Sequence, residues 1–471
     1  MTAFVVLNLL FGACNPSIEP TPTPIPTAYV KSDLIKTYEL GIEGQNYSLV
    51  GDTTLPKNTT PLHPLPTQMA DLASLKNANG TFKYVAVGAS LTAGVRDGGW
   101  FNEGMSTAYP NLIARQMGIT NFKQPLFSDT EFNGYGLKLQ TINKETPINR
   151  YKAVSNNLAI KAGGTDIILT PFDGKELNNY AVMNLTDGGF YDSFLQNNTN
   201  NTFYKLTLKR ILGQPQTAIE TQITSGDLIS VEPYQQGILK FALSGGQQSQ
   251  HLPSIITSLV AYPLSIIDIS YTGGTDLLLF KLYQKGLKKY ILLNIPNTLK
   301  LPYFKKCTRF SALKTLFQKY NLGYGFDLDE TLMLFPTPAI DSLFSYQNSS
   351  EKLINFYSKK FLKSSTPIGL GIDEQNKVIE LQKIYNEHLS FLSKKYSTPV
   401  VDINSLYEKI SNGTFVSDEG RKVTEKEFFS SDGLYPTAYG QALIANECIK
   451  TINTFYKTNI TLIKTEYYIK R

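Results

Sequence analysis

The sequence is poor in histidine, cysteine and charge. Its 471 residues include three histidines and three cysteines, and charged residues make up 18% of the chain. After Cys14, Cys307 and Cys448 are the remaining cysteines; they lie too far apart for a disulfide framework, so we expect isolated buried thiols. The net charge of +6 comes without a dense Lys/Arg tract, which argues against a nucleic-acid-binding face. We predict no metal, no cofactor and no nucleic-acid partner.

The N-terminal run "MTAFVVLNLLFGAC" is apolar and ends in small residues and Cys14. It is too short to span a bilayer, but its length suits the apolar region of an export signal. "LFGAC" resembles a bacterial lipobox, in which the cysteine is lipidated. We therefore expect residues 1–13 to be a signal peptide and Cys14 to be acylated. The alternative is a disordered N-terminus behind a cleaved signal.

The next segments indicate a tether rather than a core. Residues 14–30 are rich in Pro and Thr, which favours an extended, semi-rigid spacer. Residues 31–67 form an irregular N-terminal segment broken by proline. An acylated cysteine followed by a spacer holds a domain off a membrane. We expect an exported lipoprotein of the outer membrane or cell surface, with its main domain over residues 68–457 and a C-terminal tail over 458–471.

From about residue 80, apolar strand-like runs alternate with helical patterns, which predicts an α/β fold with a mainly parallel sheet. "KYVAVGA" (residues 83–89) is typical of a buried strand. "STAYPNLIARQMG" predicts a helix with Pro110 near its first turn and Gly118 past its end. The Asn-rich region over 170–225 is predicted to be an insertion. Further strands are expected within 227–234, 288–296 and 398–403, and further helices over 275–286, 374–396 and 436–456.

A serine follows the first predicted strand of the sheet. In "GASLTAG" (residues 88–94), Ser90 stands at a tight turn at the carboxyl end of a parallel strand, where α/β sheets bind ligands. Small neighbours leave its hydroxyl accessible to a substrate. The alternative is that Ser90 or Thr92 caps a helix.

A second stretch, "DGLYPTAYG", places Asp432 just before the last predicted helix, and together with "GASL" it resembles the SGNH/GDSL hydrolase family. The resemblance covers roughly residues 68–457. Within the family, this chain is similar to the surface lipoprotein branch found in Bacteroidetes. The stretches that carry this similarity are "QPLFSDTEFNGYG", "NIPNTLKLPYF", "GLGIDEQNKVIELQ" and "FFSSDGLYPTAYGQALIANECI". It implies a three-layer α/β/α sandwich and a four-part site for ester hydrolysis.

The first three parts of that site are implied by position. The family's first block usually reads Gly-Asp-Ser-Leu, so the resemblance implies Ser90 as nucleophile, although Ala89 departs from the pattern. In the second block, "NNLAIKAGG" offers Gly163 or the next glycine as a backbone oxyanion donor. The third block supplies an asparagine in the family, and here "YQQGILKFALSGG" places Gln235 or Gln236 near that position.

The fourth block departs most from the family's pattern. The family has Asp-x-x-His, whereas this chain has Asp432-Gly433-Leu434-Tyr435. A base that takes the serine proton typically contributes ~10²–10⁴ in rate. A tyrosine with an unperturbed pKa of about 10 is a neutral acid at pH 7 and cannot replace imidazole. The resemblance thus implies a degraded catalytic site. Alternatively, Tyr435 is a packing residue with a buried ring and a hydrogen-bonded hydroxyl.

Other groups are weaker candidates for the base. His251 follows the third block, and Asp432 itself carries a carboxylate. We expect His388 to face solvent or the core edge within its helix, and His63 lies in the irregular N-terminal segment.

Three functions follow from these observations. The first is a binding protein with little turnover, whose ligand is a glycan, an acylated molecule or a protein partner; the Tyr- and Gln-rich stretch over 234–248 suits sugars. The second is an active carboxylic-ester hydrolase that uses Ser90 on acyl or acetyl esters. The third is a non-catalytic subunit of a surface assembly.

Overall fold

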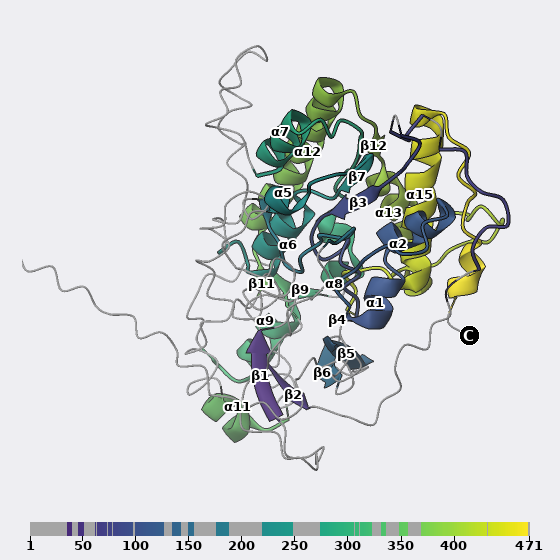
Figure 1. The fold of residues 1–471 in the computed structure, drawn as a ribbon. Helices are drawn as coiled ribbons and strands as arrows, with labels where there is room; N and C mark the ends of the chain where they lie inside the picture. Colours follow the sequence, from purple (N-terminus) through teal and green to yellow (C-terminus); the bar gives the residue numbers. More distant parts are fainter. Residues whose placement is uncertain are drawn as a thin grey trace, which may run out of the picture.

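The computed structural model describes an α/β body and several smaller sheets (Figure 1). The described residues are 35–39, 46–50, 62, 64–72, 74–77, 79–97, 99–126, 134–142, 149–154, 176–187, 219–247, 274–305, 307–309, 311–322, 331–335, 348–356, 369–430 and 432–469.

A four-stranded parallel sheet forms the centre of the body. Its strands lie in the order β12–β8–β7–β3. The three longer strands are wholly buried, as expected of a parallel sheet with helices on both faces. Because all four strands run in one direction, their carboxyl ends meet at a single edge. The bounds are β3 (Tyr84–Val87), β7 (Leu228–Val231), β8 (Tyr290–Leu293) and β12 (Val400–Val401).

Helices cover both faces of this sheet (Figure 1). On one face α2 packs against α15, and on the other α6 packs against α12. The helices are α1 (Asn102–Ser106), α2 (Tyr109–Gln116), α5 (Ile219–Gln222), α6 (Gln235–Leu243), α7 (Gly274–Gln284), α8 (Pro302–Lys305), α9 (Ser311–Lys319), α11 (Ser350–Phe356), α12 (Ile372–Tyr396), α13 (Ile403–Ser411), α14 (Glu425–Phe428), α15 (Ala438–Tyr456), and the 3₁₀ turns η5 (Thr298–Lys300) and η7 (Thr465–Tyr468).

Smaller sheets lie outside the central one. Antiparallel pairing joins β1 to β2, β10 to both β9 and β11, and β5 to both β4 and β6. Their bounds are β1 (Ile35–Glu39), β2 (Asn46–Val50), β4 (Trp100–Phe101), β5 (Gly134–Ile142), β6 (Asn149–Val154), β9 (Thr308–Arg309), β10 (Met333–Leu334) and β11 (Gly369–Leu370).

Local sequence signals explain where the helices begin and end. Pro110 lies in the first turn of α2, and Gly118 adopts φ 80° two residues past its end, a conformation that favours glycine. Helix α12 carries acidic residues in its first turn and lysines in its last, which complements the helix dipole. At α14, Thr424 and Glu427 form a capping box.

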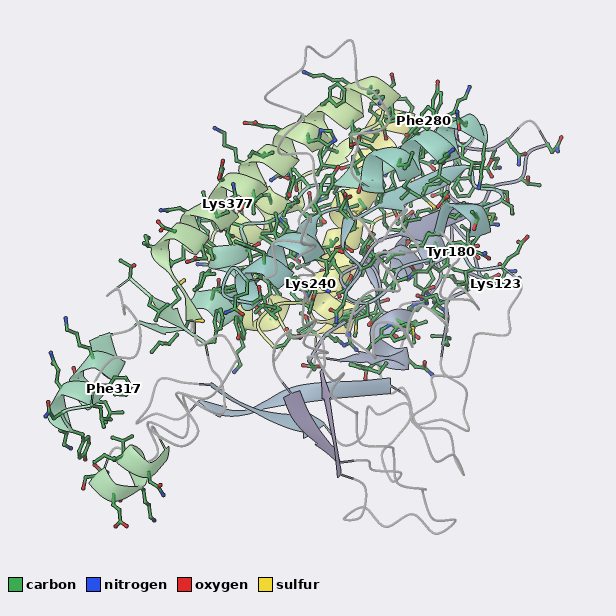
Figure 2. The ribbon with its side chains drawn as sticks, turned by 90° about the vertical axis from the view of Figure 1, so that its left-hand side faces the viewer. Lys123, Tyr180, Lys240, Phe280, Phe317 and Lys377 are labelled. Carbon is green, nitrogen blue, oxygen red and sulfur yellow. The ribbon has the colours of Figure 1, made fainter. Side chains whose placement is uncertain are left out.

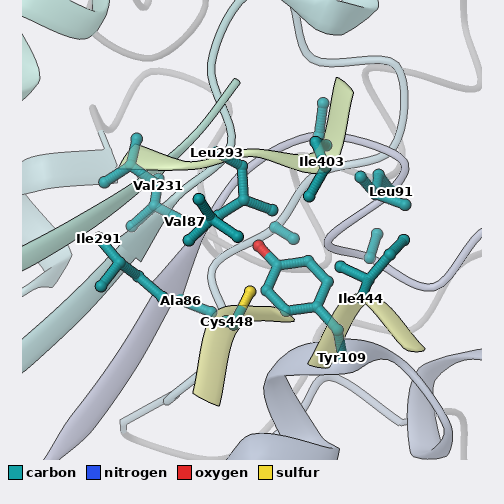
Figure 3. Packing of buried hydrophobic residues seen from close by; sticks show 14 of the residues in the cluster. Ala86, Val87, Leu91, Tyr109, Val231, Ile291, Leu293, Ile403, Ile444 and Cys448 are labelled. Carbon is teal, nitrogen blue, oxygen red and sulfur yellow. The ribbon is translucent and has the colours of Figure 1, made fainter. Parts of the chain in front are cut away.

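The core lies between the sheet and its helices. Apolar side chains from the strands, such as Val87 and Ile291, meet Tyr109 of α2 and Ile444 of α15 (Figure 3). Figure 2 shows side chains filling the space between the ribbons of the body. The core also extends past α15, because Ile463 is buried and exchanges two backbone hydrogen bonds with the Asn446 side chain.

The fold confirms the α/β class with a parallel sheet. The expected strands and helices of the body are all present, and each of the four strands is shorter than its predicted segment; the strand expected within 227–234, for example, is Leu228–Val231. Part of the expected insertion over 170–225 lies outside the described residues, as does the whole of 1–34. The expected C-terminal tail is packed against the body at Ile460 and Ile463.

Candidate functional site

Ser90 lies at the carboxyl edge of the central sheet. It follows β3 in a turn closed by backbone hydrogen bonds from Ala93 to Ala89 and from Val95 to Ser90. Gly88 permits this turn, because a Cβ there would lie 2.1 Å from the Thr92 hydroxyl oxygen. Ser90 is fully buried, and neither Ser90 nor Thr92 caps a helix in the described structure.

The carboxylate of Glu232 holds the Ser90 turn in place. The N–H groups of Ala89 and Thr92 each donate to its Oε2 at 3.0 Å, and the Thr92 hydroxyl donates to the same atom at 2.7 Å. Glu232 immediately follows β7, the neighbour of β3, and its own N–H still donates to the carbonyl of Val87 at 3.0 Å, which places its side chain next to this loop. Burial raises its pKa to about 7, against the lowering effect of these hydrogen bonds.

The last helix supports the turn from its other side. Gln441 of α15 donates from Nε2 to the carbonyl of Leu91 at 3.1 Å and accepts from the N–H of Tyr109 at 2.9 Å. One amide therefore joins the Ser90 turn, the start of α2 and α15.

Asn184 contacts the Ser90 hydroxyl directly. Its backbone N–H donates to Ser90 Oγ at 2.9 Å, and its side-chain Oδ1 lies 3.5 Å from the same oxygen. The backbone of Asn184 has φ 61°, in the left-handed region that asparagine tolerates better than most residues. Because this N–H is bonded to the serine oxygen itself, it does not have the geometry of an oxyanion donor, which points at the substrate oxygen.

Ser90 and three other buried side chains form a hydrogen-bonded ring. Gln236 donates from Nε2 to Asn184 Oδ1 at 3.3 Å, and Tyr435 donates its phenolic proton to Gln236 Oε1 at 2.9 Å. Tyr435 also contacts Ser90, which completes the ring. All four residues are at most 3% exposed. The Ser90 hydroxyl is thus surrounded by amides and a phenol.

Tyr435 is protonated in this ring. Burial raises the pKa of its phenol, and the contacts with Ser90 and Gln236 offset part of that rise. It therefore acts as a hydrogen-bond donor at neutral pH and cannot accept the proton of Ser90.

Asp432 stabilises its own turn. Its Oδ1 accepts from the N–H of Leu434 at 2.8 Å and from the N–H of Tyr435 at 3.0 Å. Gly433 has φ 69°, and a Cβ there would lie 2.8 Å from the N atom of Tyr303. The Asp432 side chain thus shapes the loop that delivers Tyr435 to the ring.

Two buried polar atoms of this region have no hydrogen-bond partner in the described structure. One is the donor Asn184 Nδ2, within the ring, and the other is the acceptor Gln235 Oε1, in the first turn of α6. An unsatisfied buried polar atom costs about 1–3 kcal/mol.

A second buried polar cluster adjoins the first through Tyr234. This residue precedes α6 with φ 61°, which is strained for a bulky side chain, and its ring stacks on Tyr385 with centroids 5.0 Å apart. Behind it, His388 Nε2 lies 2.9 Å from Asp276 Oδ2, and both side chains are at most 5% exposed. We expected His388 at the solvent or core edge, which was wrong: α12 turns it toward α7, where Asp276 pairs with it.

Asp187 links this cluster to the Ser90 loop. It lies three residues after Asn184 and accepts from the N–H groups of Gly274 and Thr275 at 2.8 and 2.9 Å, which caps the start of α7. Burial raises its pKa to about 6.

The structure brings four of the predicted site residues together. Ser90, Gln236 and Tyr435 belong to the ring, and Asp432 lies on the same loop as Tyr435. Gln235 precedes Gln236 in the first turn of α6, and its side chain forms none of the hydrogen bonds of the ring. The predicted Gly163 and its neighbour, as well as Cys14, His63 and His251, lie outside the described residues.

Sequence reasoning missed Asn184 and Glu232. A signal for Asn184 was present, because "NNYAVMN" (residues 178–184) repeats the Asn-Asn-x-Ala pattern of "NNLAIKAGG". Glu232 gave no signal, since a lone carboxylate at a strand end has no distinguishing neighbours.

Within the described ranges, no three His, Cys, Asp or Glu side chains are grouped as a metal site would require. Cys307 and Cys448 are buried with free thiols, as expected. None of the helices seen here combines the length and the apolar character needed to cross a bilayer. No protein-family model matches this chain, and no curated protein matches it significantly.

Proposed function

We propose that this chain is an exported protein with an SGNH/GDSL-like architecture and a degraded catalytic site, which binds a ligand with little turnover. The proposal combines the resemblance at "GASL" and "DGLYPTAYG" with the chemistry of the ring around Ser90. A serine becomes a nucleophile when a base accepts its proton. Among the described residues, the side chains that contact the Ser90 hydroxyl supply hydrogen bonds but no such base.

The observation that carries the proposal is the bond between Tyr435 and Gln236. In an Asp-x-x-His site the histidine would receive the serine proton, and Asp would orient it. Here the equivalent side chain donates its only proton to Gln236 Oε1. Asp432 meanwhile accepts two backbone N–H groups of its own turn. In this chain, the hydrogen bonds of Asp432 and Tyr435 stabilise the loop before α15, whereas the equivalent side chains of an enzyme would activate the serine.

The ligand chemistry follows from the polar atoms at the site. Asn184 Nδ2 and Gln235 Oε1 offer one donor and one acceptor that lack protein partners in the described structure. Side-chain amides of this kind suit the hydroxyl groups of sugars and the carbonyls of acyl esters. A glycan or an acylated glycan is therefore the ligand class that we favour.

An active-site probe tests the loss of catalysis. Fluorophosphonates label serines whose hydroxyl is activated by a neighbouring base. We expect no labelling of Ser90 in the full chain, at the level of the Ser90→Ala variant, under conditions that label an active serine esterase fully. Labelling that depends on Ser90 would contradict the proposal.

An active carboxylic-ester hydrolase is the second candidate, and one observation favours it. Glu232 is bonded to the residues that flank Ser90, and its pKa of about 7 lies where a general base works best. In that case Ser90-dependent hydrolysis should fall at least about 100-fold in Glu232→Gln. The exposed acid Glu380 on α12 provides the matched control, Glu380→Gln.

Membrane tethering through Cys14 remains part of the proposal. The lipobox-like "LFGAC" and the Pro/Thr spacer support it. Mass spectrometry of the N-terminal peptide should find acyl chains on Cys14, and Cys14→Ala should move the protein from the membrane fraction to the soluble fraction. A stable membrane partner in the absence of any ligand binding would instead favour a structural subunit.

A further inference from the structure

Three segments far apart in the sequence carry many lysines and no acidic residue. They are "KLYQKGLKK" (281–289), "SKKYSTP" (393–399) and "KTINTFYKT" (450–458), which together hold eight lysines and no Asp or Glu. Aromatic residues are interleaved with the lysines in each segment. This composition differs from that of the whole chain, in which 45 basic residues face 39 acidic ones.

The fold brings the three segments together. The ring of Tyr396 lies 5.6 Å from that of Tyr283 and 6.1 Å from that of Tyr290, measured between centroids. The hydroxyl of Tyr456 donates to the carbonyl of Tyr290 at 2.7 Å. The ends of α7 and α12 on one face of the sheet therefore adjoin the end of α15 on the other (Figure 1).

This region lies at the edge of the sheet opposite Ser90. Tyr290 is the first residue of β8, and Pro399 directly precedes β12, so both mark the amino ends of parallel strands. Ser90 and Gln235 follow the carboxyl ends of β3 and β7. A ligand held here would not depend on the Ser90 ring.

Lysine ammonium groups lie over the aromatic faces of this region. Lys288 Nζ is 5.2 Å from the ring centroid of Tyr283, and Lys395 Nζ is 5.3 Å from that of Tyr396. Tyr283 is 42% exposed, so its ring is open to solvent beside the cation. These pairs place positive charge next to flat apolar surface.

A recess of about 460 Å³ opens beside the aromatic residues. Its volume falls within the range of small-ligand sites. Phe455 presents a 46% exposed ring to it. The lining residues are Pro399, Lys450, Thr451, Thr454, Phe455 and Lys457.

The two lysines of the recess differ in their partners. Lys450 Nζ lies 2.7 Å from Asp418 and 2.8 Å from Glu447, and these two carboxylates fix its position and more than offset its charge. Lys457, which ends α15 in a left-handed conformation with φ 57°, has no ion pair within the described residues. Lys457 thus offers a positive charge without an ion-pair partner among the described residues, in the same recess as Phe455 and two threonines.

We propose that this recess binds an acidic sugar unit of an anionic glycan. The C–H face of a pyranose ring would stack on Phe455, its carboxylate would pair with Lys457, and its hydroxyls would bond to Thr451 and Thr454. The surrounding lysines of α7 and α12 would attract neighbouring acidic units of the same chain. A hollow with hydroxyl groups suits a discrete ring better than it suits a flat anionic membrane. This inference goes beyond the proposed role of the Ser90 site and does not rest on it.

Calorimetric titration of the full chain with tetragalacturonate tests the proposal, with neutral maltotetraose as the uncharged comparison. We expect saturable binding of the acidic tetramer that weakens by about fivefold or more between 50 and 300 mM NaCl. Lys457→Gln and Phe455→Ala should each weaken it by about fivefold or more, since each removes one side of the contact. The neutral tetramer should bind more weakly than the acidic one.

Matched variants control for charge and folding. Lys319→Gln removes an exposed lysine that lies 5.1 Å from the Tyr320 ring on another part of the surface, and Val416→Ala trims a side chain that is 55% exposed. Both should bind the acidic tetramer like the wild type. The proposal fails if Lys457→Gln and Lys319→Gln have equal effects, or if no binding occurs. It also fails if a single-stranded oligonucleotide or an anionic phospholipid vesicle binds more tightly than the sugar at equal salt.

Discussion

The phenolic hydroxyl of Tyr435 donates a hydrogen bond to the side-chain oxygen of Gln236 at 2.9 Å, across 199 positions of sequence. Both residues stand where the resemblance to SGNH hydrolases implies parts of the catalytic apparatus. Their bond joins the first turn of α6 to the loop that precedes α15. The positions that would serve hydrolysis in an enzyme thus hold these two segments together.

Removal of that hydroxyl should destabilise the fold. In Tyr435→Phe the buried Gln236 Oε1 loses its donor, which should lower the free energy of unfolding by about 1–3 kcal/mol. Denaturant unfolding followed by tryptophan fluorescence or circular dichroism measures the change. Tyr283→Phe, at a 42% exposed tyrosine, is the control and should change stability by less than about 0.5 kcal/mol. Equal effects of the two substitutions would show that the bond to Gln236 contributes nothing.

Restoring a histidine should not restore an enzyme. We expect esterase activity of Tyr435→His to stay within about tenfold of background, although a working base contributes ~10²–10⁴. The reason is that Gln236 is bonded to Asn184, and one missing oxyanion donor alone costs roughly 10²–10³. Rates on p-nitrophenyl acetate and butyrate measure this. A gain above about 100-fold that also requires Ser90 would show that the remaining site is intact.

Glu232 should make stability depend on pH. Its pKa is raised from 4.5 to about 7 in the folded state, so between these values the folded chain binds more protons than the unfolded chain. Its contribution is complete below about pH 4.5 and is lost as the pH rises toward 7. At 1.36 kcal/mol per pKa unit, the loss is about 3 kcal/mol.

Unfolding free energies at pH 5 and pH 7 test this dependence. The decrease between the two values should be smaller in Glu232→Gln than in the wild type, because the amide does not titrate. Asp187, whose pKa is raised from 3.8 to about 6, acts in the same direction and is retained in both proteins. Glu380→Gln should leave the pH dependence unchanged. An identical decrease in wild type and Glu232→Gln would refute the assignment.

The buried pair of His388 and Asp276 should show strong coupling. Replacing either residue by alanine leaves the other buried without its partner, which should cost about 3 kcal/mol or more. The double variant should cost at least about 1 kcal/mol less than the sum of the two single variants. The exposed pair of Lys383 and Glu387 on α12 is the control, with an expected coupling below about 0.5 kcal/mol. Additive costs at the buried pair would contradict the predicted coupling.

The sequence was most informative where the signals are local. Strand β3 is an apolar run of valine and alanine that stands out from its polar flanks, and α2 has Pro110 at its start and Gly118 after its end. Such patterns depend on neighbours within one turn or one strand. The turn at Ser90 was predicted for the same reason.

The site was less predictable because its contacts are long-range. Glu232 meets the Ser90 turn across 140 or more positions, and Asn184 meets Ser90 across 94. His388 lies on the buried stripe of α12, three residues after Tyr385 and four before Leu392, so this helical spacing already indicated its burial; its pairing with Asp276 on α7 is the long-range part. No pattern within one segment reports such pairings.

Hydrolysis of short- and medium-chain p-nitrophenyl esters by the full chain, measured beside Ser90→Ala, tests the central claim most directly. The ring of Ser90, Asn184, Gln236 and Tyr435 predicts equal rates for the two proteins at every chain length, at the level of spontaneous hydrolysis. Turnover in the wild type that disappears in Ser90→Ala would mean that a base reaches Ser90, and the claim of a degraded site would be wrong.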